Sequence, residues 1–349
     1  MKKIKKIFYS FYRKNLIDYS TNGFKGKLFV KLQKLKENKK YYFGSKNRKK
    51  KFLILRITPG GGFFSIFFSI LYFFYKVKTK ENKKLAHVDL ENFHTKYNED
   101  TKINNTYNSW EYYFKNLSNL KLSEIYKSKN VYFSKKSIDT TQFMNFNSLK
   151  KFRKFVNKNI FIHKKILKEV EDINKKKFKK NRMIGVHFRG SDMKYTPNHP
   201  FPPSSNQIIK LIDKLLLQDD SQKIFLITED RNNLDLMKKK YQDKLVYLNS
   251  FRTKDNKLFS HDARRNHRYN LGKEILIETL LLSKCNQIIS SKTNVFLAAL
   301  IFSKKPKKIN LIDNGINSSN IFLSMFLWKL KKFFPLKFFE TQKVKYLKI

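Results

Sequence analysis

The chain has 349 residues, enough for two domains of ordinary size that each bury a core of their own. Hydrophobic residues make up 41% and aromatic residues 15% of the sequence, which excludes an intrinsically disordered protein. The formal net charge is +49. Such an excess attracts polyanions in general, whether nucleic acid, anionic lipid head groups or acidic glycans.

Most of this charge has a compositional explanation. Of the 76 basic residues only 11 are Arg, and the Lys residues are spread along nearly the whole chain beside abundant Asn, Ile, Phe and Tyr. That combination is typical of an AT-rich coding sequence. A nucleic-acid-binding protein is expected to carry Arg-rich patches and a known binding module, and the sequence contains neither. We therefore favour compositional drift and expect no specific nucleic-acid partner.

A single cysteine, Cys285, excludes an intramolecular disulfide and a multi-cysteine metal site. Its apolar neighbours predict a buried, unreactive thiol. The basic start of the chain, 1–13, is not followed by an apolar segment of the length that a secretory signal needs. The most apolar run, 62–75, is shorter than the ~20 residues of a membrane-spanning helix. We expect a cytoplasmic protein, with peripheral contact with the inner face of an anionic membrane left open.

The first half predicts one βαβ unit between less regular segments. Two parallel strands with a right-handed crossover are expected here, and a glycine-rich turn, 59–62, precedes the connecting helix. The predicted elements are strand 52–58, helix 63–77, strand 85–90, and basic helices around 148–158 and 162–178 in a stretch of mostly helix and loop, 91–180.

The second half predicts a regular alternation of strands and helices, which is typical of a doubly wound parallel sheet. A long polar loop, 249–270, interrupts it. The expected elements are strand 183–188, helix 204–218, strand 223–228, helix 232–241, strand 244–248, helix 272–284, strand 286–290, helix 293–302 and strand 308–312.

The fold class expected from these patterns is α/β, with two Rossmann-like lobes, parallel sheets flanked by helices and a cleft between the lobes. The tail mixes apolar residues with Lys, and it could pack back across a lobe or lie on a membrane. The expected domains are a basic segment 1–50, an α/β lobe with a helical region 51–180, a Rossmann-like domain 181–315 and a helical tail 316–349.

Three predicted strands of the second half end in polar residues. Because the carboxyl ends of parallel strands meet at one edge of an open sheet, where ligands bind, we expect these residues to converge. They are Arg189, Gly190, Ser191 and Asp192 after the first strand, Glu229 and Asp230 after the second, and Ser290, Ser291, Thr293 and Asn294 at the third.

These residue types fit a pyrophosphate. The donor fork of Arg189 suits a phosphate, and Thr293 or Asn294 can cap the following helix, whose free N–H groups form an anion site. Glu229 or Asp230 can accept hydrogen bonds from a ribose or a base edge. The alternative for any single strand end is a simple turn or helix cap, and it is the combination of three ends with an Arg that favours a binding site.

No metal site is expected. His199, His261 and His267 are scattered over loops, where a lone histidine is more often a surface residue than a ligand. Glu274 and Glu278 lie one turn apart on the same face of a predicted helix. This spacing predicts either solvated pairing with the many Lys residues or a carboxylate that faces the cleft.

The motifs in this order resemble a family, the superfamily of the nodulation α-1,6-fucosyltransferases and the protein O-fucosyltransferases. The resemblance covers roughly 52–313. It rests on the segments 187–192, 226–230, 272–278, 280–285 and 290–295, and upstream on 61–65, 87–92 and 108–114, which are similar to the N-terminal lobe of bacterial members.

The resemblance implies an inverting glycosyltransferase of the two-lobed GT-B type that uses GDP-fucose as donor, a glycan or lipid-linked glycan as acceptor, and no metal or other cofactor. Residues 51–180 would then be the acceptor-side lobe and 181–315 the nucleotide-sugar domain. Arg189 matches the Arg that contacts the donor pyrophosphate, and the implied donor-binding set is His187, Arg189, Gly190, Ser191, Glu229, Asp230, Ser290, Ser291, Thr293 and Asn294. The expected acceptor or cleft residues are Gly61, Gly62, Glu111 and Glu278.

The sequence departs from the family at two points. Some relatives carry a second Arg where Gly190 stands, and a Glu where this chain has 197–199. The catalytic base is therefore open, with His199, Asp192 and Glu111 as candidates in that order, and Arg189 as the leaving-group stabiliser. The alternative function is a catalytically inactive nucleotide-sugar-binding or membrane-associated protein.

Overall fold

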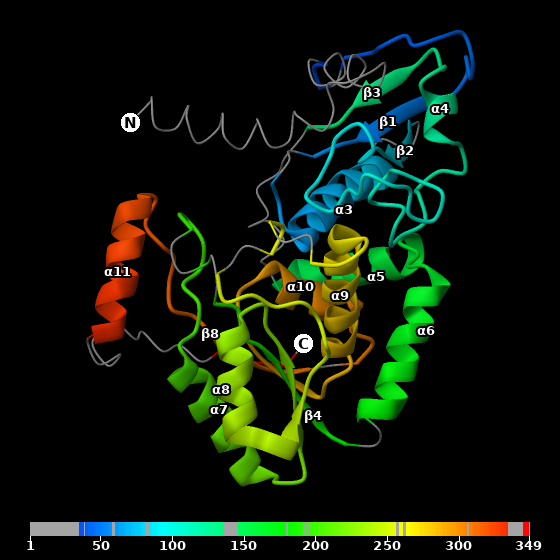
Figure 1. Ribbon diagram of the computed structural model, residues 1–349. Helices are drawn as coiled ribbons and strands as arrows, with labels where there is room; N and C mark the ends of the chain where they lie inside the picture. Colours follow the sequence, from blue (N-terminus) through cyan, green and yellow to red (C-terminus); the bar gives the residue numbers. More distant parts are fainter. Residues whose placement is uncertain are drawn as a thin grey trace. The chain divides into compact units, whose positions relative to one another are not determined.

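The computed structural model forms two compact units, described separately below (Figure 1). The first comprises Met1–Gly61, Ser69–Tyr112 and Asn116–Ile138, and the second Gly62–Phe68, Tyr113–Lys115 and Asp139–Ile349. No helix among the residues placed by the structure is long and apolar enough to cross a membrane. The structure describes residues 35–37, 39–57, 60–80, 84–135, 146–178, 181–190, 193, 196–255, 258–260, 263–305, 307–333 and 345–348.

The first unit contains a three-stranded parallel sheet of order β2-β1-β3. Its strands are β1 (Lys51–Leu55), β2 (Lys84–Val88) and β3 (Val131–Phe133). The helix α3 (Phe63–Lys80) connects β1 to β2, so the predicted βαβ unit and its parallel pairing are confirmed. The strand β3 and the short helix α4 (Leu122–Ile125) lie in a stretch expected to be helix and loop. Three residues are too few to show the period of a strand.

The second unit contains a six-stranded sheet of order β6-β5-β4-β7-β8-β9, in which β4 to β8 are all parallel. The predicted α/β fold class, with parallel sheets flanked by helices, is confirmed. The strands are β4 (Met183–His187), β5 (Lys223–Ile227), β6 (Leu245–Val246), β7 (Gln287–Ser291), β8 (Lys308–Ile312) and β9 (Lys345–Lys348). The tail contains the helix α11 (Ile321–Phe333) and also a strand that was not expected, β9, which pairs antiparallel with β8.

The helices of the second unit follow the predicted alternation closely. The turn before α7 shows why it starts where it does: Ser204 Oγ accepts from the Gln207 backbone N–H, and Gln207 Oε1 accepts from the Ser204 N–H. The helices are α5 (Phe146–Asn159), α6 (Lys164–Ile173), α7 (Ser205–Gln218), α8 (Arg231–Tyr241), α9 (His267–Leu282), α10 (Asn294–Phe302) and α11 (Ile321–Phe333).

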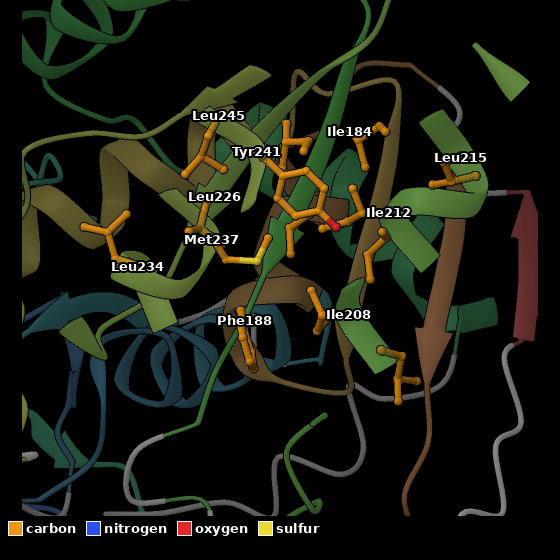
Figure 2. Close-up of a cluster of buried hydrophobic side chains, with 14 residues drawn as sticks. Ile184, Phe188, Ile208, Ile212, Leu215, Leu226, Leu234, Met237, Tyr241 and Leu245 are labelled. Carbon is orange, nitrogen blue, oxygen red and sulfur yellow. The ribbon is translucent and has the colours of Figure 1, made fainter. Parts of the chain in front are cut away.

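The two faces of β4 pack against different helices. Ile184, Val186 and Phe188 belong to a buried cluster with side chains of α7 and α8, such as Ile208 and Met237 (Figure 2). The opposite face of β4 lies against the C-terminal end of α9, where a Cβ built on Gly185 would come 2.5 Å from Leu282 Cδ1 and 3.0 Å from Cys285 Sγ. Glycine at position 185 therefore allows the close approach of α9 to the centre of the sheet.

This packing predicts that Gly185→Ala lowers the free energy of unfolding by about 1–3 kcal/mol, because the added methyl overpacks a core with no room for it. Gly62→Ala is the matched control, since a Cβ at Gly62 has nothing within 4 Å. Urea unfolding of both variants measures the difference. Equal effects of the two substitutions would show that α9 does not constrain position 185.

Candidate functional site

The register of three parallel strands brings the predicted binding residues to one edge of the sheet. His187 is the partner of Ile227 on β5 and of Ser290 on β7. The order of the strands reverses between β4 and β7, because the chain leaves β4 toward β5 and β6 and returns on the other side through β7 and β8. In open α/β sheets such a switch point, outside the carboxyl ends of the strands, is where ligands bind.

Arg189 and Glu229 form an ion pair at this edge, and both side chains are partly buried. Arg189 Nε lies 3.7 Å from Glu229 Oε1, and the Gly190 N–H donates to the same oxygen over 3.4 Å. The Arg189 side chain is 30% exposed, against 14% for Glu229. Glu229 thus holds the guanidinium from one side, while the group keeps a surface that solvent or a ligand can reach.

His187 lies beneath this edge and is uncharged at neutral pH. Its Nδ1 is 3.3 Å from Ser290 Oγ and 3.1 Å from Thr293 Oγ1. Burial lowers the pKa of the imidazole to about 4, and Glu229 acts against this shift. The ring therefore orients the Ser290 and Thr293 hydroxyls without adding a positive charge to that of Arg189.

The N-terminus of α10 adds unused donors and acceptors to the same place. Thr293 is its N-cap, and its Oγ1 accepts from the Phe296 N–H over 3.2 Å. The first N–H groups of a helix have no partner within it and attract an anion. Ser291 Oγ and Asn294 Oδ1 are buried without a hydrogen-bond partner among the described residues. Buried polar groups in that state point to a missing partner.

Asp230 has a structural function. Its Oδ1 accepts from the Asn232 N–H over 2.8 Å, which caps α8. The loop after β6 pairs with the same turn, since the Arg231 N–H donates to Thr253 O and the Thr253 N–H donates to Glu229 O. Of the two acidic residues predicted for the donor, Glu229 faces Arg189 and Asp230 fixes the start of α8.

A buried Arg–Glu pair supports this turn from below. Arg252 Nε donates to Thr228 O at the end of β5, over 2.9 Å, and its Nη2 lies 3.2 Å from Glu278 Oε1 on α9. The two side chains are 3% and 5% exposed. Burial raises the pKa of Glu278 to about 7, and the Arg252 charge opposes this shift. Solvated pairing of Glu278 with Lys, one of the two expectations, is therefore wrong.

Glu274, one turn before Glu278, pairs with a second arginine of the same loop. Its carboxylate accepts two hydrogen bonds from Arg264, over 2.5 and 2.8 Å, and one from the Phe251 N–H. Sequence reasoning missed Arg252 and Arg264. The available signal was the concentration of Arg, because four of the 11 arginines of this Lys-rich chain lie in the loop 249–270 and the guanidinium fork matches a carboxylate.

The remaining predicted residues have other surroundings or lie outside the described residues. His199 is exposed, with Nδ1 2.9 Å from Pro197 O, and its carbonyl accepts from the Asn317 N–H. Glu111 is in the first unit, where its Oε1 accepts from Asn116 Nδ2 over 2.6 Å. The residues not described are Ser191, Asp192 and His261.

Three other expectations concern the glycine pair, the single cysteine and the absence of a metal site. Gly61 belongs to the first unit and Gly62 to the second. Cys285 is a buried free thiol, as predicted, and burial raises its pKa to about 12. Among the residues that the structure describes, no group of three or more His, Cys, Asp or Glu is placed to hold a metal ion.

The fold is similar to that of a solved fucosyltransferase structure. The chain is similar to the fucosyltransferase NodZ from Bradyrhizobium, with a TM-score of 0.50 and 12% sequence identity over 78% of this chain and 100% of that chain. A NodZ α-1,6-fucosyltransferase co-crystallised with GDP matches with a TM-score of 0.47 and 14% identity over 76% and 96% of the two chains. Neither the protein-family models nor the curated protein sequences gave a match.

The buried pair predicts a large stability effect. Arg252→Ala should lower the free energy of unfolding by about 3–5 kcal/mol, because it leaves Glu278 buried without its cation and frees three backbone carbonyls. Arg231→Ala is the control, since Arg231 and Asp235 form an exposed pair worth at most about 1 kcal/mol.

Urea unfolding measures both variants, together with the double variant Arg252→Met/Glu278→Leu. We expect the double variant to be more stable than Arg252→Ala, because it removes both charges at once. A loss of the same size in Arg231→Ala and Arg252→Ala would contradict the structural importance of the buried pair.

Proposed function

We propose that this protein is an inverting glycosyltransferase that transfers fucose from GDP-fucose to a glycan or lipid-linked glycan, without a metal ion. The observation that carries the proposal is the edge formed by β4, β7 and α10. Arg189 and the helix N-terminus lie there with Ser291 and Asn294, which have buried side-chain oxygens without a hydrogen-bond partner among the described residues. The resemblance of the motifs to fucosyltransferases and the fold shared with NodZ supply the reaction class.

The proposed role of each residue follows from the negative charge of the donor pyrophosphate. Arg189 and the N–H groups at the start of α10 hold the donor pyrophosphate, and Glu229 keeps the guanidinium in place. Ser291 and Asn294 supply hydrogen bonds to the nucleotide part of the donor. As part of the proposal, residues 51–180 bind the acceptor and residues 181–315 bind the donor. The cytoplasmic location stays a prediction.

The proposed reaction is a nucleophilic substitution at the anomeric carbon of fucose, with no change of oxidation state. The acceptor hydroxyl oxygen attacks the anomeric carbon of fucose, the bond from that carbon to the β-phosphate oxygen breaks, and GDP leaves with the electron pair. Arg189 and the helix donors stabilise the charge that develops on the β-phosphate. The acceptor proton passes to a base, for which His199, Asp192 and Glu111 remain the candidates.

The second candidate function is a protein that binds GDP-fucose without transferring it. The observation that favours it is Gly190, which takes the place of a second Arg in some relatives. A single guanidinium supplies less leaving-group stabilisation than two. Binding of the donor without release of GDP or fucose would support this alternative.

Ligand binding tests the donor assignment. GDP and GDP-fucose at ~100 times their dissociation constant should stabilise the folded protein by ~2.7 kcal/mol, and EDTA should leave the effect unchanged. Thermal or chemical unfolding with GDP, GDP-fucose, UDP and UDP-glucose measures this. Stabilisation by the UDP compounds with none from GDP would refute the donor assignment.

Substitution of Arg189 tests its role. Arg189→Ala should abolish transfer, and Arg189→Lys should reduce the rate by ~10²–10³, because Lys keeps the charge but loses the planar fork. Arg182→Lys is the matched control, since Arg182 directly precedes β4 at the other end of the same strand and is exposed. Near-normal turnover in Arg189→Lys would show that the residue is not the pyrophosphate ligand.

A further inference from the structure

The helix α11 presents its apolar side chains to solvent. Five large hydrophobic residues in its first two turns are 40–74% exposed, whereas the small polar Ser324 among them is fully buried. The exposed residues are Ile321, Phe322, Leu323, Met325 and Phe326. A surface helix of a globular protein normally has the opposite orientation, with its apolar stripe toward the core.

Polar contacts hold the helix in this orientation. Asn320 Oδ1 accepts from the Phe322 N–H over 2.9 Å at the start of the helix, and Ser324 Oγ donates to Ser318 O over 3.1 Å. These contacts fix which side of α11 faces solvent. The exposed apolar residues form one contiguous patch, because they lie within two turns of the same helix. Contiguous apolar patches of this kind mark interaction surfaces.

The segment before α11 is tied to the second unit. Asn317 is buried, and its Nδ2 donates to Met193 O over 2.7 Å and to Thr196 O over 3.1 Å. The Phe201 N–H donates to Gly315 O over 3.0 Å. These hydrogen bonds join 315–317 to 193–201, the segment that follows Arg189 in the chain. A partner that binds α11 would therefore bind the unit that carries the proposed donor site.

Charge decides between the possible partners of this face. Lys329 is exposed on α11, the sequence adds Lys331 and Lys332 in the last turn, and the whole chain carries a formal charge of +49. A second copy of the chain would bring an equal charge and be repelled. An anionic bilayer attracts the same charge and accepts apolar side chains below its head groups.

We propose that α11 docks this protein on the surface of an anionic lipid bilayer. The side chains of its first two turns enter the interface between head groups and acyl chains, and Lys329 lies among the head groups. The helix lies in the plane of the surface. The inference does not rest on the proposed transferase activity.

Vesicle binding by the full-length chain tests this inference. Phe322→Ser/Phe326→Ser should weaken partitioning onto vesicles of equal parts phosphatidylglycerol and phosphatidylcholine by about tenfold or more, because each Phe contributes buried apolar area. The matched control is Phe161→Ser/Leu217→Ser, which removes two exposed hydrophobic side chains elsewhere in the same unit and leaves the charge unchanged. The control should bind like the unmodified protein.

Salt separates the two components of binding. At 0.5 M NaCl the electrostatic attraction falls for every variant, and the ratio between the control and the α11 variant should persist, since apolar insertion is not screened. Equal binding by the two variants, or no binding of the unmodified protein to these vesicles, would overturn the proposal. Sedimentation that shows a dimer lost only in the α11 variant would also overturn it, in favour of self-association. Circular dichroism establishes that each variant is folded.

Discussion

The in-register parallel pairing of β4 with β5 on one side and β7 on the other is the constraint on which the rest of the site depends. It sets His187 level with Ile227 and Ser290, so the residues that follow each strand emerge at the same height. Parallel strands cannot be joined by a tight turn, and each connection passes through a helix. As a consequence α8 and α10 both begin at this edge, where their N-termini favour negative charge.

An Arg follows the first strand of each unit, but the surroundings of the two arginines differ. Arg56 follows β1 in the same way that Arg189 follows β4, but its guanidinium is buried over the rings of Phe93 and Phe133 and donates to Ser134 O. Arg189 differs because a carboxylate holds one side of its guanidinium and the remainder is exposed. The distinction depends on what lies across the sheet, and neighbouring residues in the sequence do not contain that information.

Sequence reasoning placed the parallel strands of the second unit within two residues of their ends, because each buried strand is a short apolar run with clear breaks. It placed α9 less well, since this helix begins at His267, inside the predicted loop 249–270. It expected Arg189 and Thr293 at one edge of the sheet for the same reason, since each follows a buried strand, whereas His187 was implied only by the family resemblance. It missed β3, whose three residues show no period, and β9, whose pairing with β8 depends on the path of the tail. The Arg252–Glu278 pair was also missed, because the two residues are far apart in the sequence and only the folded chain brings them into contact.

The scarcity of Arg in this chain carries information that the large charge obscures. If drift has made Lys the default cation, an Arg persists where a point charge on a flexible stem does not suffice. Among the described residues, five arginines make two or more guanidinium hydrogen bonds to carbonyl or carboxylate oxygens: Arg56, Arg153, Arg231, Arg252 and Arg264. Arg189 has different surroundings, because its Nε lies 3.7 Å from Glu229 Oε1 and 30% of its side chain is exposed. The many Lys residues supply long-range attraction to any polyanion, whereas the planar guanidinium groups of these arginines make several hydrogen bonds at once.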